Sequence, residues 1–364
     1  MQKRFNAEYA NLWKEVPLFL LYELVSTGRR EKIANNRILL VNTCLIGEFA
    51  ASVSSMADFI KRDEGKTIDL LVAPSAVSLA KHIRGVGNVY AASTVYNRAT
   101  ETHEVATLPT QYEEVILMRM SPAAYRALRP VRSARVRTAA KEFAALGVSL
   151  VDTTIRRARP KQWQDVNTEM LAVKQIPSFE EVFDFTPEDS TFLKKFPFMD
   201  SPTKKVLIHA GSFWVMKYWK PERWIELLTL IHGTGDFSFI FVGAGPDQAD
   251  FDHIAAKLPF PIYSVIDQTS ILELVLLMRA ANYFIGMDSG PSNLARLADL
   301  RSLVILGPGP HMYLPRDSRD RIVDKSNGRG MYQRFFAKKN GFIEQITAED
   351  AFNAFKGILN QHAK

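Results

Sequence analysis

Cysteine is nearly absent from the sequence, and this limits the chemistry that the chain can carry. Cys44 is the one cysteine among 364 residues, so no disulfide can form within the chain. It lies in an apolar run, which favours a small buried side chain over a nucleophile, and a chain without disulfides suits a reducing compartment. The sequence also lacks the Cys/His spacings of zinc sites, the P-loop, the serine nucleophile elbow and the metal-binding helix motif. We therefore expect no metal and no cofactor.

Long apolar runs are absent too. None reaches the roughly 20 residues that cross a bilayer, and the apolar stretch at 16–22 contains a proline and lacks the cleavage site of a secretory signal. Residues 5–34 predict a broken helical segment, for which two interpretations stay open. It packs on the first domain, which we favour, or it rests on a membrane with Arg29, Arg30 and Lys32 beside lipid phosphates. We expect a cytoplasmic protein, with peripheral contact to the inner face of the cytoplasmic membrane left open.

The length and composition indicate a globular protein of more than one domain. A chain of 364 residues exceeds what one hydrophobic core usually serves, and 47% hydrophobic with 23% charged residues excludes a mainly disordered chain. The net charge of +7 has two interpretations: an ordinary Lys/Arg excess, which we favour slightly, or work beside anionic material such as a phosphorylated glycolipid. Basic residues are not interleaved with aromatic ones as in single-strand binders, so no nucleic acid is expected as a partner.

The chain alternates short apolar runs with helical patterns, and it does so twice. The first series predicts strands over residues 37–42, 68–72, 89–91 and 112–118, with helices over 48–61 and 75–83. After a basic stretch at 126–137 and a further strand and helix within 151–174, a proline-rich linker is predicted at 175–204. The second series predicts strands over 205–210, 238–243, 283–286 and 302–307. It predicts helices over 221–232, 247–257, 271–279 and 347–359, and one more helix directly after Asp288.

This repeated alternation predicts parallel sheets with helices on both faces. The predicted boundaries are an N-terminal helical extension at 1–36, an N-terminal α/β domain at 37–185, a C-terminal α/β domain at 200–340 and a closing helix within 341–364. Two such domains predict a cleft between them, where ligands prefer to bind.

The most informative motif is GMDSGPSNLA at residues 286–295. An apolar strand ends at Asp288, Ser289 and Gly290 form a tight turn, and Pro291 can start a helix. Free N–H groups at a helix start favour a phosphate or pyrophosphate, and the glycine lets a ligand approach the backbone closely. The alternative is that the aspartate or serine only caps the helix, and for this segment alone the alternative is better supported.

Two other segments each follow the first strand of a predicted domain. Ser212 and Lys217 come after the strand at 205–210, where a hydroxyl and a lysine can bind phosphate together; a plain loop with a solvated lysine is equally supported. Glu48 begins the helix after the strand at 37–42, where a carboxylate can act as a general base. For Glu48 alone, a charge that favours a helix N-terminus is the better-supported interpretation.

The segment 243–246, which contains two glycines, is a less specific signal for a binding site. It follows a strand, but Gln248 stands where the dinucleotide-binding fingerprint needs its third glycine. We therefore predict a turn at this position.

Taken in order, these segments resemble glycosyltransferase family 9, the bacterial heptosyltransferases of lipopolysaccharide core assembly. The family opens with an apolar strand, a Gly-Asp pair and a helix of small residues, which is similar to residues 38–41, Gly47 with Glu48, and 50–55. Its middle strand often contains Tyr-Asp-x-Val-Ile, which is similar to residues 112–116.

The second half carries the more specific motifs. The family has a small or hydroxyl residue and then Lys-x-Trp-Pro, which is similar to Ser212, Lys217, Trp219 and Pro221, with one residue inserted before the proline. The family signature Asp-Ser/Thr-Gly-x-x-His-Leu/Ile-Ala is similar to residues 288–295.

The resemblance, which covers residues 37–315, implies the GT-B fold: two Rossmann-like domains with a cleft between them, and the donor held mainly by the C-terminal domain. It implies a metal-independent transfer that inverts the anomeric centre, with Glu48 as the catalytic base. The donor-binding residues that it implies are Ser212, Lys217, Asp288, Ser289, Gly290, Pro291 and Asn293.

The partners that the resemblance implies are a nucleotide-sugar donor, ADP-heptose, and a glycan or glycolipid acceptor in lipopolysaccharide or related surface polysaccharide synthesis. Two positions depart from the family. Asn293 stands where the family has histidine and can donate a hydrogen bond but carries no charge, and Glu48 is one methylene longer than aspartate. Both departures affect which donor sugar is expected more than they affect the expectation of sugar transfer itself. The alternatives are a sugar-nucleotide epimerase of the GT-B fold and a non-catalytic sugar-nucleotide-binding protein.

Overall fold

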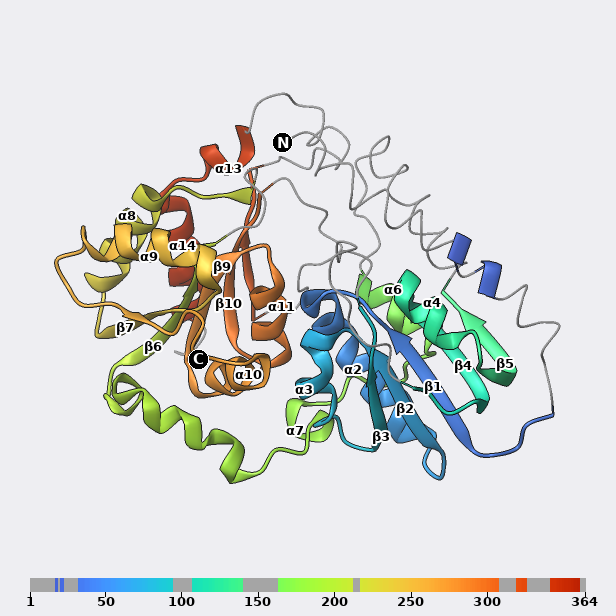
Figure 1. The fold of residues 1–364 in the computed structure, drawn as a ribbon. Coiled ribbons are helices and arrows are strands. Elements are labelled where there is room, and N and C mark those ends of the chain that lie inside the picture. Colours follow the sequence, from blue (N-terminus) through green and yellow to red (C-terminus); the bar gives the residue numbers. More distant parts are fainter. Residues whose placement is uncertain are drawn as a thin grey trace. The chain divides into compact units, whose positions relative to one another are not determined.

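The computed structural model describes the chain as two compact units. Its described residues are 17–18, 20–22, 32–93, 107–139, 163–211, 217–307, 319–325 and 341–360. Unit 1 holds the described residues up to 184, and unit 2 holds those from 185 onward (Figure 1). The change of unit falls inside the proline-rich region 175–204. Most of the N-terminal extension and the strand expected after residue 150 lie outside the described residues.

Unit 1 contains a five-stranded parallel sheet in the order β3-β2-β1-β4-β5. Its strands are β1 (Arg37–Asn42), β2 (Thr67–Val72), β3 (Val86–Ala91), β4 (Gln111–Arg119) and β5 (Arg132–Thr138). Its helices are α2 (Ile46–Arg62), α3 (Val77–Ala80), α4 (Pro122–Leu128), α6 (Trp163–Met170) and α7 (Phe179–Val182), with a 3₁₀ turn η1 (Pro74–Ala76).

Burial explains the central elements of unit 1. Residues 38–41 of β1 are at most 1% exposed, as expected for a strand covered on both faces. In α2, Phe49, Val53, Met56 and Ile60 recur at helical spacing and are all buried, so they form the stripe that faces the core. The predicted helix over 75–83 is shorter than expected, because its first turn is the 3₁₀ turn η1.

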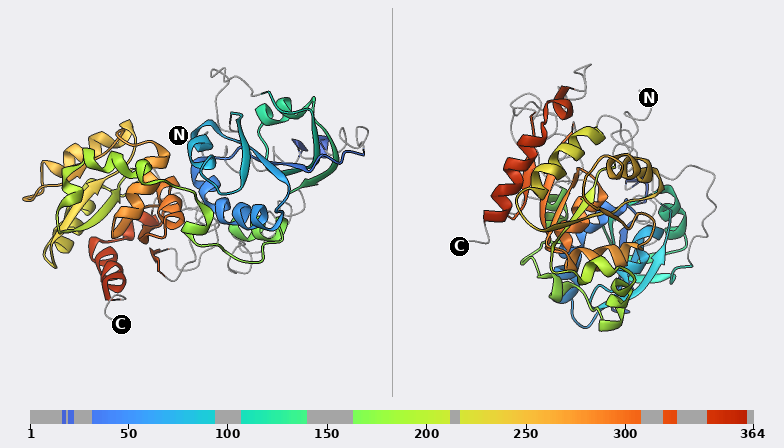
Figure 2. Two further views of the ribbon diagram at one scale, coloured as in Figure 1. Left: turned by 90° about the horizontal axis from the view of Figure 1, so that it is seen from below. Right: turned by 90° about the vertical axis from the view of Figure 1, so that its left-hand side faces the viewer.

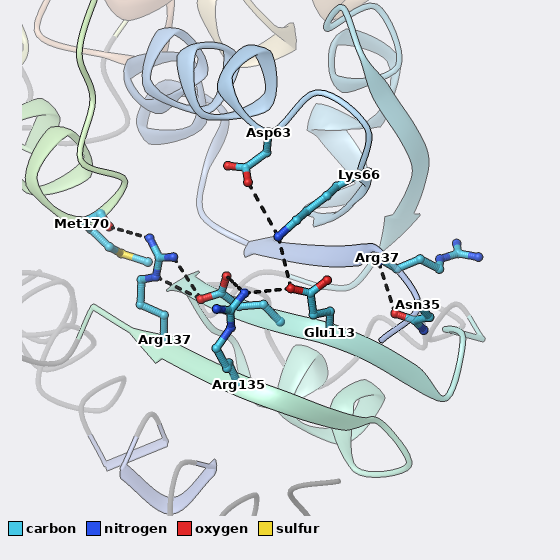
Figure 3. A network of polar contacts seen from close by, with 9 residues as sticks. Asn35, Arg37, Asp63, Lys66, Glu113, Arg135, Arg137 and Met170 are labelled. Carbon is cyan, nitrogen blue, oxygen red and sulfur yellow. Dashed lines mark hydrogen bonds and ion pairs between the residues drawn. The ribbon is translucent and has the colours of Figure 1, made fainter. Parts of the chain in front are cut away.

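The basic stretch at 126–137, to which no element was assigned, contains the end of α4 and the edge strand β5. Two arginines of β5 pair with acidic residues of the neighbouring strand β4 (Figure 3). Arg135 Nη2 lies 2.9 Å from Glu113 Oε1, and Arg137 Nη2 lies 3.0 Å from Glu114 Oε1. Charged side chains on an edge strand also discourage pairing with a second sheet. These two arginines therefore have local countercharges and do not form a bare basic surface.

The described part of the N-terminal extension contains Tyr22, which is buried against unit 1. Its ring meets that of Tyr125 in α4 edge to face, with ring centroids 6.4 Å apart, whereas Leu20 and Leu21 are exposed. The contact agrees with the interpretation that this segment packs on the first domain. No helix in the described part of the chain combines the length and the apolar character needed to cross a membrane.

Unit 2 contains a six-stranded parallel sheet in the order β11-β10-β9-β6-β7-β8. Its strands are β6 (Lys204–His209), β7 (Phe237–Phe241), β8 (Tyr263–Ser264), β9 (Tyr283–Met287), β10 (Arg301–Ile305) and β11 (Arg321–Val323). Its helices are α8 (Pro221–His232), α9 (Gln248–Ala255), α10 (Ile271–Ala280), α11 (Gly290–Leu297), α13 (Gly341–Gln345) and α14 (Ala348–Leu359), with 3₁₀ segments η2 (Pro187–Lys195), η3 (Pro197–Asp200) and η5 (Gly245–Asp247).

Helices cover both faces of this sheet (Figures 1 and 2). α8, α9 and α14 pack together in one layer, and α10 and α11 pack together in the other. The main core lies under the first layer, where Trp219 and Trp224 meet edge to face with ring centroids 5.1 Å apart. Trp219 Nε1 also donates to the carbonyl of Ile346 at 3.0 Å. This anchor holds the chain just before α8, and with it Lys217.

Both sheets have the strand order of a Rossmann fold, which confirms the prediction of two parallel α/β units. In chain order, each sheet runs 3-2-1-4-5, and unit 2 adds a sixth strand. The order reverses between β1 and β4 in unit 1 and between β6 and β9 in unit 2. Ligands of such sheets bind beyond the carboxyl ends of the strands at this switch point. The strand order therefore predicts that ligands bind at the segments that follow these four strands.

Candidate functional site

Glu48 lies at the switch point of unit 1. β1 ends at Asn42, a short turn follows, and Glu48 sits in the first turn of α2. Arg119, the last residue of β4, donates from Nη1 to Glu48 Oε2 at 2.6 Å. The arginine side chain is 1% exposed and that of Glu48 is 11% exposed. A guanidinium at this distance stabilises the charged form of a carboxylate, and a general base must be unprotonated to act.

The backbone fixes Arg119 beside the turn after β1. The Thr43 N–H donates to the Arg119 carbonyl at 3.1 Å, and the Ser121 N–H donates to Thr43 Oγ1 at 2.9 Å. The register between β1 and β4 shifts where Asn42 comes to face Arg119. Sequence reasoning selected Glu48 but missed Arg119. The available signal was a lone arginine at the end of the apolar run 115–118.

In unit 2, two residues that the sequence proposed separately form one ion pair. Lys217 Nζ donates to Asp288 Oδ2 at 2.7 Å and approaches the Asp288 carbonyl at 3.4 Å. Lys217 is 13% exposed and Asp288 only 3% exposed. Asp288 directly follows β9, and Lys217 precedes α8. The lysine is therefore held at the carboxyl end of the sheet by a carboxylate, not solvated in a loop.

The loop after β9 continues into α11 as predicted, with Ser289 at the helix N-cap and Gly290 and Pro291 in the first turn. The Ser289 hydroxyl donates to the Met287 carbonyl at 3.1 Å and lies 3.1 Å from His209 Nδ1. Asn293 is 7% exposed, and its Nδ2 donates to the Ser289 carbonyl at 3.4 Å. Its amide thus bonds within the helix.

Sequence reasoning also missed Asp247, in the loop after β7. Residues 245–247 form the 3₁₀ turn η5, in line with the predicted turn. Asp247 Oδ2 accepts from the Ala244 N–H at 2.9 Å and lies 3.7 Å from His209 Nε2. Burial opposes ionisation of Asp247, but the nearby imidazole of His209 and the hydrogen bond from the Ala244 N–H outweigh it and hold the Asp247 pKa below its usual range.

Two glycines leave room for the Asp247 carboxylate. A Cβ added at Gly211 or at Gly243 would overlap with it. We expect Gly211→Ala to destabilise the protein by about 1–3 kcal/mol, the usual cost of overpacking, in urea unfolding. Gly233→Ala is the control, because a Cβ there would have ordinary contacts at 3.6 Å and beyond. Equal unfolding midpoints for the two variants would show that the loop with Asp247 moves aside without a cost in stability.

Ser212 lies outside the described residues, so its prediction is not tested. Within the described ranges, no group of three or more His, Cys, Asp or Glu side chains is placed to hold a metal ion.

The geometry defines a Rossmann-like α/β class of protein, with acidic and basic side chains gathered at the switch points of its two sheets. The family model of glycosyltransferase family 9 (heptosyltransferase) matches residues 111–329, well over half of the chain. The chain therefore belongs to this family, as its motifs predicted, and is a glycosyltransferase. The matched range includes Arg119, Lys217 and Asp288 but begins after Glu48. A search of curated proteins finds no match.

Solved structures of low identity share the fold. The glycosyl transferase family 9 protein from Veillonella parvula DSM 2008 has a TM-score of 0.68 at 13% identity, covering 92% of this chain and 99% of that chain. E. coli ADP-heptose lps heptosyltransferase II has a TM-score of 0.63 at 13% identity, with 90% and 100% covered. E. coli heptosyltransferase WaaC with ADP has a TM-score of 0.59 at 15% identity, with 89% and 99% covered. These likenesses confirm the GT-B class with two Rossmann-like units.

Proposed function

We propose that this chain transfers a sugar from a nucleoside diphosphate-sugar to a glycan or glycolipid acceptor, inverting the anomeric centre without a metal ion. The observation that carries the proposal is the buried Lys217–Asp288 pair beside the start of α11, at the switch point of unit 2. A cation and outward N–H groups in one place suit a diphosphate. The Glu48–Arg119 pair at the switch point of unit 1 supplies a candidate base.

In the proposed reaction, a Glu48 carboxylate oxygen takes the proton of the acceptor hydroxyl as that oxygen attacks the anomeric carbon. The bond between this carbon and the phosphate oxygen breaks, and the nucleoside diphosphate leaves with its electron pair. Lys217 shares its ammonium between Asp288 and a donor phosphate, and Ser212 contacts the same diphosphate. The backbone of Gly290 and Pro291 borders the phosphates. Preorganised donors of this kind stabilise charge that develops on a leaving group.

We propose ADP-heptose as the donor. E. coli WaaC has been solved with ADP and with ADP-2-deoxy-2-fluoro heptose, which supports an adenine nucleotide. Asp288 and Asn293 border the sugar in this proposal.

The acceptor is a lipopolysaccharide core sugar or a related surface glycan, and the reaction takes place in the cytoplasm or at the inner face of the cytoplasmic membrane. The exposed Leu20 and Leu21 support the peripheral contact.

Thermal shift against ADP-, UDP- and GDP-sugars tests the proposal first. A ligand that binds the folded protein stabilises it by mass action, about 2.7 kcal/mol at one hundred times its Kd. We expect the ADP-sugar to raise the melting temperature most. The same ligand is then incubated with and without an acceptor glycan.

Sugar transfer that depends on the acceptor supports the proposal. Conversion of the donor without any acceptor would instead show an epimerase. Tight binding without turnover across a panel of acceptors would show a non-catalytic binding protein. Absence of binding by all three nucleotide classes would overturn the donor site.

A further inference from the structure

A short segment of the N-terminal extension has apolar side chains on two sides. Residues 17–18 and 20–22 are helical, and the buried Tyr22 meets the ring of Tyr125 in α4 edge to face (Figure 1). Leu20 and Leu21 belong to the same helical turn but are 54% and 44% exposed. Because successive residues of a helix point in different directions, Tyr22 faces unit 1 while the two leucines face away from it. Packing on unit 1 therefore accounts for Tyr22 but not for the leucines.

The outer face of α4, which Tyr22 contacts, carries arginines. The buried residues of α4 are three alanines and a leucine, so its other residues form the outer face. Tyr125 lies on this face, and Arg129, four residues later, is its neighbour along the helix. Arg126 and Arg129 are exposed there, and Arg132 is exposed at the start of β5. Three exposed arginines thus follow one another along α4 and the turn into β5, beside the segment that Tyr22 anchors.

The charge of this region has one sign. Residues 115–137 contain six arginines and no aspartate or glutamate. The arginines at 119, 135 and 137 form ion pairs with glutamates of unit 1, and the other three are the exposed ones. Exposed apolar side chains beside cations are the combination that binds an anionic bilayer, because the apolar groups enter between the lipid headgroups and the cations attract the lipid phosphates.

We propose that Leu20, Leu21, Arg126, Arg129 and Arg132 form a docking surface for the anionic lipid surface of a membrane. Burial of the tyrosine between them fixes the leucines to unit 1. The two interpretations of the N-terminal extension therefore hold together: one side of the segment packs on the first domain, and the other side contacts the membrane. The inference deepens the proposed function and rests on it in one respect, because a glycolipid acceptor is held in such a membrane.

The docking surface starts close to the candidate base of the same unit. α4 begins at Pro122, three residues after Arg119, whose guanidinium lies 2.6 Å from Glu48. At a rise of about 1.5 Å per residue, α4 extends roughly 10 Å from this point to its basic end. A bilayer on the outer face of α4 can therefore present the headgroup of a glycolipid near Glu48 while the lipid chains stay in the membrane.

Co-sedimentation of the full chain with vesicles tests the proposal. One set of vesicles is phosphatidylcholine alone, and the other contains about one third phosphatidylglycerol, which is anionic. Neither set contains a glycolipid and no nucleotide is added, so the result does not depend on the transfer reaction. We expect binding to the anionic vesicles to be stronger by about tenfold or more at low salt, and to weaken at high salt because salt screens exposed charges.

Two multiple variants test the two parts of the docking surface. Arg126→Gln/Arg129→Gln/Arg132→Gln is expected to weaken binding to anionic vesicles by roughly 10- to 100-fold, because each cation beside such a bilayer contributes about fivefold. Leu20→Ser/Leu21→Ser is expected to weaken it by about tenfold, through loss of apolar contact with the lipid. All five side chains are exposed, so the melting temperatures should stay close to that of wild type.

Arg84→Gln and Ile176→Ser are the matched controls. Arg84 has a side chain that is 54% exposed and lies just before β3, at the opposite edge of the sheet from β5. Ile176 is 54% exposed, as Leu20 is, but it follows Gln175, whose N–H donates to Asp58 of α2 at 3.3 Å. α2 and α4 cover opposite faces of the sheet, because right-handed crossovers lead in opposite directions from β1 and from β4. Both controls are expected to bind anionic vesicles as wild type does.

Equal binding of wild type to both kinds of vesicle would overturn the role of the arginines, and wild-type binding by the leucine variant would overturn the role of the leucines. Losses in the controls as large as those in the surface variants would show an unspecific contact and overturn the proposal. Undiminished vesicle binding by the arginine variant, with weaker transfer to a phosphorylated glycan, would assign the arginines to the acceptor instead. If the leucine variant does not fold, the arginine variant and the salt dependence decide.

These failures leave the proposed transferase intact, because binding of ADP-sugar and transfer to a water-soluble acceptor are measured without vesicles. Wild type that binds anionic vesicles but none of the ADP-, UDP- and GDP-sugars would support the docking surface and overturn the donor site. The two proposals can therefore fail separately.

Discussion

Replacement of Glu48 by glutamine is expected to slow sugar transfer by roughly 10²- to 10⁴-fold, the range for loss of a general acid–base group. Glutamine keeps the shape of the side chain and can still accept the hydrogen bond of Arg119, but its amide cannot take the proton of the acceptor hydroxyl. Glu48 belongs to unit 1 and the proposed donor residues to unit 2, so the Kd of the nucleotide sugar should not change. Initial rates and calorimetry on the same preparation separate the two quantities.

Asp58→Asn is a matched control for the loss of charge. Asp58 lies in the same helix, α2, and its Oδ2 accepts from Arg62 Nε at 2.8 Å. Both substitutions therefore weaken a carboxylate–guanidinium pair of unit 1, and both are expected to lower the melting temperature. Only the Glu48 variant should lose transfer. Turnover close to that of wild type in Glu48→Gln would remove Glu48 from the mechanism.

The elements best predicted from the sequence are those whose burial leaves an apolar pattern. β1, β4, β6 and β9 are runs of buried residues, and α8 occupies the predicted residues Pro221–His232, because a proline opens it and Trp224, Leu227 and Ile231 recur on its buried face. Strands β5, β8 and β11 were missed. β5 is rich in arginines whose partners are on another strand, and β8 and β11 have only two and three residues.

The candidate site was predicted as separate residues, and the structure supplies their pairing. A sequence pattern marks a strand end or a helix start, so Glu48, Lys217 and Asp288 could be selected one at a time. It does not show which strand ends are neighbours. Arg119 lies 71 residues from Glu48, and the two meet only because β4 is next to β1. Asp247 meets His209 for the same reason, through the pairing of β6 with β7.

Replacement of Lys217 by methionine is expected to reduce both stability and transfer. It leaves the Asp288 carboxylate, 3% exposed, without the ammonium at 2.7 Å. Removing one partner of a buried pair costs about 3–5 kcal/mol. Transfer should fall by roughly 10²- to 10³-fold in addition, the effect of losing one preorganised donor to a developing charge. Urea unfolding and initial rates measure the two effects.

The double variant Lys217→Met/Asp288→Asn separates these effects. An asparagine at position 288 carries no charge that needs a counterion, so we expect most of the stability to return. Transfer should stay low, because the cation proposed to face the leaving diphosphate is still missing. Recovery of transfer together with stability would show that the pair supports only the fold.

The ion pair between Lys325 and Asp350 is the control for burial. Its Nζ–Oδ1 distance is also 2.7 Å, but its side chains are 38% and 28% exposed. Because water screens such a pair, Lys325→Met is expected to cost at most about 1 kcal/mol and to leave transfer unchanged. Because the two ion pairs have equal distances, the difference in unfolding free energy between the two lysine variants measures how much burial at the switch point adds to stability. A cost for Lys217→Met as small as that for Lys325→Met would mean that solvent reaches Asp288. Lys217 would then be a mobile ligand-binding cation and not part of a buried pair.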